Sequence, residues 1–140
     1  HGGEHMTMIP KRYEKEATIL VVDDTRFMRL LLTDILRKNG FENIYEASNG
    51  LEAIELYKRH RPDLVTMDII MPEMDGLMAL EKILSIDRDA KVVVISALNQ
   101  RDLIIRALKI GAKDFITKPF RPETVAAIVR RILGESHSAS

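Results

Sequence analysis

Short apolar runs alternate along this chain with longer stretches in which apolar residues recur at helical spacing. The short runs are rich in β-branched residues, which is typical of strands buried on both faces of a parallel sheet. Each run has the length of a strand and leads into a polar or charged residue. The runs occupy residues 17–22, 44–47, 64–68, 91–95 and 114–117.

The segment after the first run has the features of an amphipathic helix. A polar residue at 24–25 can cap its start, and the sequence at 39–40, Asn-Gly, predicts its end. Within it, Phe27, Leu31 and Ile35 lie at i, i+4 spacing. We therefore expect these three side chains to form the face that packs on the sheet.

Four further helices are expected. The first begins near Asn49-Gly50, the second near Gly76, and the third covers about 100–110. The fourth has a 3.6-residue apolar period that begins at Val125. Strand and helix thus alternate five times, which favours an α/β fold with a parallel sheet between two layers of helices. This is the doubly wound, flavodoxin-like (βα)5 architecture.

The chain is long enough for one domain with a substantial core. Residues 1–16 have no periodicity and are interpreted as a tag remnant followed by a loose lead-in. Residues 17–134 form the predicted domain, and residues 135–140 are expected to be a disordered tail.

Composition excludes several classes of function. Lysine plus arginine and aspartate plus glutamate both number 21, so no overall charge favours nucleic acid or an anionic membrane. The absence of cysteine excludes disulfides and thiol chemistry. No apolar run approaches the roughly 18 residues of a membrane span. We expect a soluble cytoplasmic protein that neither binds nucleic acid directly nor inserts into a membrane.

Polar residues with complementary chemistry follow four of the predicted strands. Asp23 and Asp24 follow the first, Asp68 ends the third, Ser96 follows the fourth and Lys118 follows the fifth. Ligands of open parallel sheets bind outside the carboxyl ends of the strands. With the strand order 2-1-3-4-5, the first and third strands are neighbours, and three carboxylates converge in one crevice.

Such a cluster suits a cation and a phosphoryl group. Close carboxylates repel unless a cation joins them, and a solvent-reached site of oxygen donors favours Mg²⁺. A hydroxyl and a fixed ammonium can stabilise phosphoryl oxygens while a carboxylate acts as the nucleophile. Each residue alone has an ordinary explanation as a cap, turn or solvated charge. Their combination at four strand ends favours a site.

With these residues, the segment from about Thr18 to Leu133 resembles the receiver domain of two-component response regulators. The type is closest to the stand-alone chemotaxis regulators of the CheY type, because no output domain follows the fifth helix. The order 2-1-3-4-5 is known for this family and is thus implied by the resemblance. The matching segments are 20–24, 68–76, 96–97 and 111–120.

The resemblance implies a role for each carboxylate. Asp68 would be the phosphoacceptor. Asp23, Asp24, Asp68 and the backbone carbonyl of Ile70 would bind Mg²⁺. Lys118 would contact the phosphoryl group, and the peptide bond to the following proline would be cis.

The resemblance also implies a two-state switch rather than an enzyme. A sensor histidine kinase would phosphorylate the acceptor, Ser96 would move toward the phosphoryl oxygen and Phe115 would turn inward. The surface of the fourth helix, fifth strand and fifth helix would then change its affinity for a downstream protein. Bases exceed acids in this part of the chain, so we expect an acidic partner segment that Arg106 or Lys109 contacts.

Two residues depart from the best-known chemotaxis pattern. Ile70 and Leu98 occupy positions where polar residues can help to orient an attacking water. Apolar side chains there should shield an acyl phosphate, and we expect slow self-dephosphorylation.

Three rival interpretations stay open at this stage. The chain could be a receiver cut from a larger DNA-binding regulator. It could be a haloacid dehalogenase-type phosphatase, although that family needs Asp-x-Asp after its first strand, and this chain has an adjacent pair. It could also be a scaffold whose site no longer functions.

Overall fold

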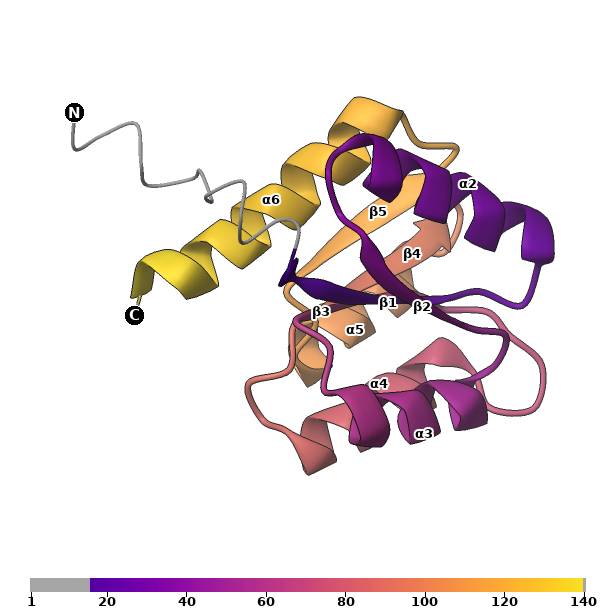
Figure 1. Cartoon of the computed structure of the whole chain (residues 1–140). Helices are drawn as coiled ribbons and strands as arrows, with labels where there is room; N and C mark the ends of the chain where they lie inside the picture. Colours follow the sequence, from indigo (N-terminus) through magenta and orange to yellow (C-terminus); the bar gives the residue numbers. More distant parts are fainter. Residues whose placement is uncertain (1–15, 140) are drawn as a thin grey trace.

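The computed structural model describes residues 16–139, so the predicted tag remnant lies almost entirely outside the described residues. A central sheet separates two layers of helices (Figure 1). One layer packs on each face, as the alternation of strands and helices predicted. No helix within 16–139 is both long and apolar enough to cross a membrane.

The sheet is parallel throughout and has the strand order β2-β1-β3-β4-β5 within the described residues. This order confirms the expected doubly wound fold. The strands are β1 (Thr18–Val22), β2 (Asn43–Ala47), β3 (Leu64–Asp68), β4 (Val92–Ala97) and β5 (Asp114–Lys118). All residues of the central strand β3 are buried, which explains why its sequence is a continuous run rather than an alternating one.

Helices follow each strand at the predicted positions. They are α2 (Arg26–Lys38), α3 (Gly50–His60), α4 (Gly76–Ile86), α5 (Arg101–Ile110) and α6 (Pro122–Ala139). Side chains cap three of them: Thr25 accepts from Met28 N on α2, Asn49 from Glu52 N on α3, and Asp75 from Met78 N on α4.

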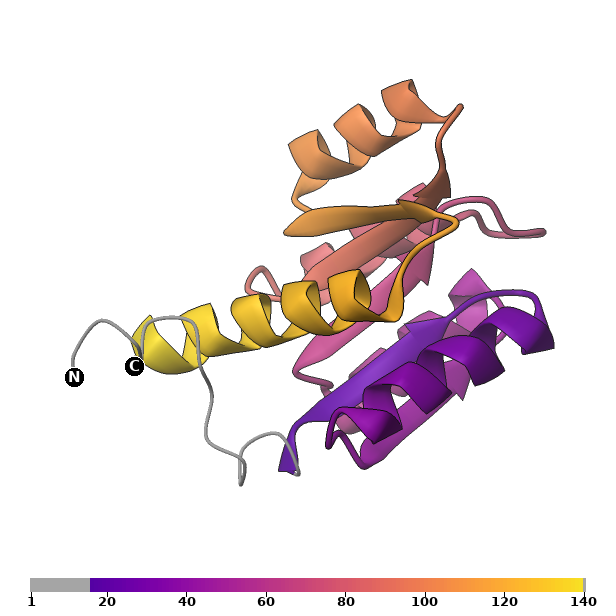
Figure 2. The same ribbon diagram turned by 90° about the horizontal axis from the view of Figure 1, so that it is seen from above.

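The two faces of the sheet bury separate cores. Helices α3, α4 and α5 cover one face with a core that includes Tyr57, Leu80 and Ile104. Helices α2 and α6 cover the other face, with Leu36 and Val129 among their buried residues. In Figure 2 the loops that follow the carboxyl ends of β1, β3, β4 and β5 gather on one side of the molecule.

The predicted inner face of α2 is partly wrong. Leu32, Ile35 and Leu36 are its buried apolar residues, whereas Phe27 is 72% exposed and Leu31 lies at the surface. The helix carries two apolar rows, and each residue advances the helical angle by about 100°. Phe27 therefore lies about 80° from Ile35 and farther still from the centre of the buried row.

The expected disordered tail begins within helix α6. The backbone of residues 135–139 continues helix α6 to Ala139. No proline follows Pro122 in the sequence to end the helix. Only the last residue of the predicted tail, Ser140, lies outside the described residues.

Candidate functional site

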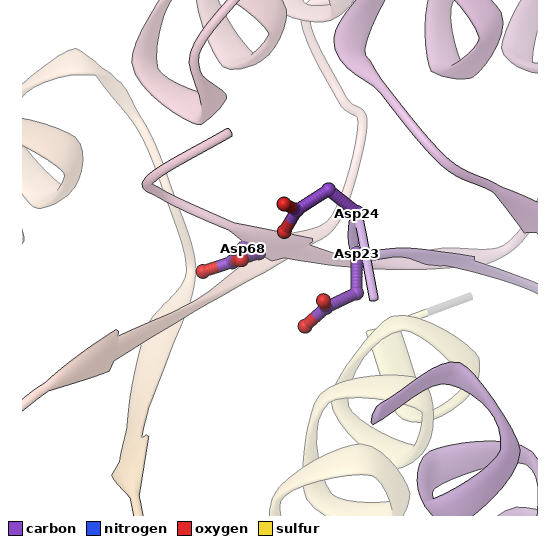
Figure 3. Close-up of side chains that lie close together, drawn as sticks. All are labelled: Asp23, Asp24 and Asp68. Atoms are coloured by element: carbon purple, nitrogen blue, oxygen red, sulfur yellow. The ribbon is translucent and has the colours of Figure 1, made fainter. Parts of the chain in front are cut away.

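The candidate site lies at the carboxyl end of the sheet, where β1 and β3 are neighbours. Val22 pairs with Met67, so the next residue of each strand, Asp23 and Asp68, emerges at the same edge. Asp24 follows from the β1–α2 turn. One oxygen from each of the three carboxyl groups lies within 4.8 Å of the others (Figure 3). The convergence predicted from the strand order is confirmed.

Asp23 is held rigidly by the start of helix α2. Its Oδ1 atom accepts hydrogen bonds from the backbone N of Thr25 at 2.9 Å and from Thr25 Oγ1 at 3.0 Å. The side chain is 1% exposed. Since Oδ1 is occupied by these two donors, Oδ2 is the oxygen of Asp23 that faces the other charged groups.

Lys118 reaches this cluster from β5 at the far side of the sheet. Its Nζ atom lies 3.4 Å from Asp23 Oδ2 and 3.6 Å from Asp68 Oδ1. The peptide bond between Lys118 and Pro119 is cis, as the resemblance implied. The ammonium group is thus a fixed positive charge placed between the two buried carboxylates.

Asp68 has a raised pKa. Burial raises its pKa from 3.8 to about 6, and repulsion from Asp23 and Asp24 acts in the same direction. The Lys118 ammonium and a hydrogen bond from the backbone of Ile70 partly oppose this rise in pKa. The residue is 6% exposed. The single positive charge of the ammonium does not balance the negative charges of three clustered carboxylates. A divalent cation bound beside it would supply the remaining positive charge.

The donor set fits such a cation. Carboxylate oxygens at this separation suit a hard ion, and the exposed Asp24 leaves one side of the cluster open to water. Mg²⁺ favours this arrangement because it keeps several of its waters. Asp23, Asp24 and Asp68 are therefore the described residues that could hold it.

A glycine brings helix α4 against the backbone of the acceptor strand. The N–H of Gly76 donates to the carbonyl of Ile69 at 2.7 Å. A Cβ atom built on Gly76 would lie 2.2 Å from the backbone oxygen of Asp68. No side chain fits there without moving the end of β3, so this glycine fixes the position of Asp68 as well as the start of α4.

The two predicted switch residues are found in distinct environments. Ser96 is buried at the end of β4, where its hydroxyl donates to the side chain of Gln100. Phe115 is partly exposed on β5 and lines a hollow of about 390 Å³ between β5 and α5. The phenyl ring thus lies on the outer surface rather than turned inward.

Two apolar side chains near the strand ends are exposed to solvent. Ile70 is 50% exposed and Leu98 is 71% exposed. Both follow a site residue by two positions, and neither is covered by the rest of the described chain.

Sequence reasoning missed Arg29. Its Nη1 atom donates to the backbone carbonyl of Asp23 at 2.7 Å, and its Nε atom pairs with Glu46 Oε1 at 3.1 Å. Arg29 thereby ties the β1–α2 turn to β2. No local spacing rule joins residues 29 and 46; the pairing of Val21 with Glu46 in the sheet brings them together.

Comparison with known proteins places this site in a family context. Residues 19–130 match the model of the response regulator receiver domain. The chain is 53% identical over 115 residues to the chemotaxis protein CheY of Bacillus subtilis, covering 82% of this chain and 96% of that protein. It is 51% identical to the CheY of Thermotoga maritima, covering 81% and 95%.

A solved structure supports the same relationship. The crystal structure of the CheX-CheY-BeF3-Mg²⁺ complex from Borrelia burgdorferi contains a chain that superposes with a TM-score of 0.75 at 41% identity. The match covers 81% of this chain and 85% of that chain. The similarity thus extends over most of both chains.

Proposed function

Because the chain belongs to the response regulator receiver domain family, we propose that it is a chemotaxis-type phosphoacceptor switch whose acceptor is Asp68. The observation that carries this proposal is the position of Asp68: a buried carboxylate between two other acids and the Lys118 ammonium. The identity of about 50% to several CheY proteins of similar length favours the chemotaxis type over the DNA-binding alternative.

Asp68 would act as the nucleophile toward a phosphohistidine of a sensor histidine kinase. A carboxylate oxygen forms a bond to phosphorus while the bond from phosphorus to one histidine nitrogen breaks, and the ring, protonated on its other nitrogen, leaves as neutral imidazole. The product is an acyl phosphate. Asp68 must be ionised for this attack, and its pKa of about 6 leaves it largely ionised at neutral pH.

Lys118 would neutralise charge as the phosphoryl group arrives. Its Nζ already lies within 3.6 Å of an acceptor oxygen, so little movement is needed to contact a phosphoryl oxygen. Asp23, Asp24, Asp68 and the carbonyl of Ile70 would hold Mg²⁺. When bound, that ion supplies positive charge to the phosphoryl oxygens.

Ser96 and Phe115 would carry the signal outward. Phosphorylation adds a charge of about −1.5 to −2, and the Ser96 hydroxyl can donate to the new oxygens. Phe115, which lines a hollow with Leu98, Ile105 and Leu108, would then turn inward. The face formed by α5, β5 and α6 would change shape as a result.

That face suits a protein partner with acidic residues. Arg101, Arg106 and Lys109 are exposed on α5, next to the exposed apolar side chains of Ile105 and Leu108. Receivers of this family interact with kinases and with downstream proteins, and the Borrelia burgdorferi CheY is solved in complex with CheX. Charge reversal at Arg106 or Lys109 should weaken binding of the downstream protein.

The proposal is tested by intact mass after incubation with acetyl phosphate, with and without Mg²⁺. We expect one phosphoryl adduct on the wild-type chain that requires Mg²⁺. Asp68→Asn should abolish it, whereas Asp34→Asn, at an exposed aspartate of α2 that pairs with Lys38, should leave it intact. An adduct that survives Asp68→Asn, or no adduct at all, would refute the assignment.

A further inference from the structure

The hydroxyl of Ser96 is engaged in a contact that the proposed switch must break. Ser96 is buried at the end of β4, and its Oγ atom donates to Gln100 Oε1 at 2.7 Å. The carbonyl of Ala97, at 3.2 Å, is the longer alternative acceptor. A serine hydroxyl has one proton, so it cannot donate to Gln100 and to a phosphoryl oxygen at once.

Gln100 is well placed to compete for that proton. It lies directly before α5, and its side chain turns back toward the strand instead of capping the helix. The same Oε1 atom accepts from the backbone N of Ala97 at 3.1 Å. The Gln100 backbone N donates to the carbonyl of Ala97 at 3.2 Å, which closes the short loop between β4 and α5.

We propose that Gln100 is a positioning residue that holds the Ser96 hydroxyl away from the phosphoryl site until Asp68 is modified. This inference rests on the proposed function. In the unmodified chain, Gln100 stabilises the resting orientation of Ser96. After modification, Ser96 donates to the phosphoryl oxygen, and the side-chain oxygen of Gln100 keeps only the hydrogen bond from Ala97 N.

The exchange also links the site to α5. Gln100 accepts hydrogen bonds from Leu103 N and Ile104 N through its backbone carbonyl, both at 3.1 Å. A change in its side-chain contacts therefore acts on the first turn of the helix that forms the proposed partner face. Gln100 sets how readily Ser96 leaves the resting state, and it does so without touching the phosphoryl group.

Removing the competing acceptor should favour the modified state. A hydrogen bond of this kind is worth a factor of roughly 2 to 10 in an equilibrium constant. Gln100→Ala should therefore bind beryllium fluoride, a stable mimic of the phosphoryl group, roughly 2- to 10-fold more tightly in the presence of Mg²⁺. Gln100→Glu keeps the acceptor and adds charge, so it should bind the mimic more weakly than the wild type.

The decisive experiment is a double-mutant cycle on the full chain. Beryllium fluoride affinity is measured by ¹⁹F NMR in saturating Mg²⁺ for wild type, Gln100→Ala, Ser96→Ala and the double variant. We expect Gln100→Ala to tighten binding in the wild-type background and to have no effect in the Ser96→Ala background. Asn99→Ala, at the exposed neighbouring position, serves as the matched control and should not change affinity.

The outcomes separate this inference from the function on which it rests. Equal effects of Gln100→Ala in both backgrounds, or no tightening at all, would overturn the role of Gln100 while Asp68-dependent binding persists. Wild-type binding that is absent, or that survives Asp68→Asn, would overturn the proposed function and this inference with it. Thermal melts of each variant confirm that the compared chains are folded.

Discussion

The charge of Asp68 should destabilise the metal-free protein. Its pKa is raised from 3.8 to about 6, mainly by burial. A tenfold change in proton affinity is worth about 1.4 kcal/mol, so the ionised carboxyl lowers the free energy of unfolding by about 3 kcal/mol at neutral pH. Asp68→Asn removes that charge. We expect the substitution to raise the free energy of unfolding by about 1–3 kcal/mol. The increase is below the full value because burying the new amide has its own desolvation cost.

The pH dependence distinguishes this cause from a general packing effect. The folded pKa lies above the unfolded value, so folding favours the protonated form of Asp68. The destabilisation is absent below about pH 3.8, develops between about pH 3.8 and 6, and is complete above that range. The difference in unfolding free energy between Asp68→Asn and wild type should therefore be largest above pH 7 and only about a third as large near pH 4.5.

Urea unfolding in chelator at pH 4.5 and 7.5 measures that difference directly. Mg²⁺ at pH 7.5 should reduce the difference in unfolding free energy between Asp68→Asn and wild type. The ion stabilises the folded wild type by mass action and binds the variant less well. Asp34→Asn is the control and should show little pH-dependent difference. A difference that does not change with pH, or a variant less stable than wild type at pH 7.5, would refute the reasoning.

Three further predictions follow from the structure. Gly76→Ala should lower the free energy of unfolding by about 1–3 kcal/mol and slow labelling by acetyl phosphate, because its Cβ would displace the backbone of Asp68; normal stability and labelling would contradict this. Thr66→Val should raise the free energy of unfolding by about 1 kcal/mol, seen as a higher urea midpoint, since the buried Thr66 hydroxyl has no hydrogen-bond partner within the part of the chain that the structure describes; a lower midpoint would show that the hydroxyl is satisfied. Ile70→Asn should speed loss of a radioactive phosphoryl label, because an exposed polar group can orient water where Ile70 excludes it; an unchanged rate would remove the shielding argument.

Much of this fold could be predicted because each element carries its own local signal. The sequence alone indicates the buried run of β3 and the helix starts at Thr25, Asn49 and Gly76. The convergence of Asp23 with Asp68 follows once the strand order is known. That order came from the family resemblance, not from the pattern, since periodicity does not specify which strands pair.

Other features depend on contacts that no local pattern encodes. Helix α2 has two apolar rows, and only its packing on the sheet decides that Leu36 is buried and Phe27 exposed. Arg29 reaches Glu46 across a strand pair. Gln100 looked like an ordinary helix boundary because its significance lies in the direction of its side chain. Side-chain direction at an element boundary is a tertiary property.

The Lys118 bridge has a consequence for how the site comes into being. Lys118 and Asp23 are 95 residues apart in the chain, and β3 and β4 lie between their strands in the sheet. Closing a loop of that length carries a large entropic cost, which is met only after the intervening strands have paired. The charged centre should thus be among the last parts to assemble during folding. A chain that has not placed β5 lacks the ammonium group, so competence for phosphorylation would report that β1, β3, β4 and β5 have paired.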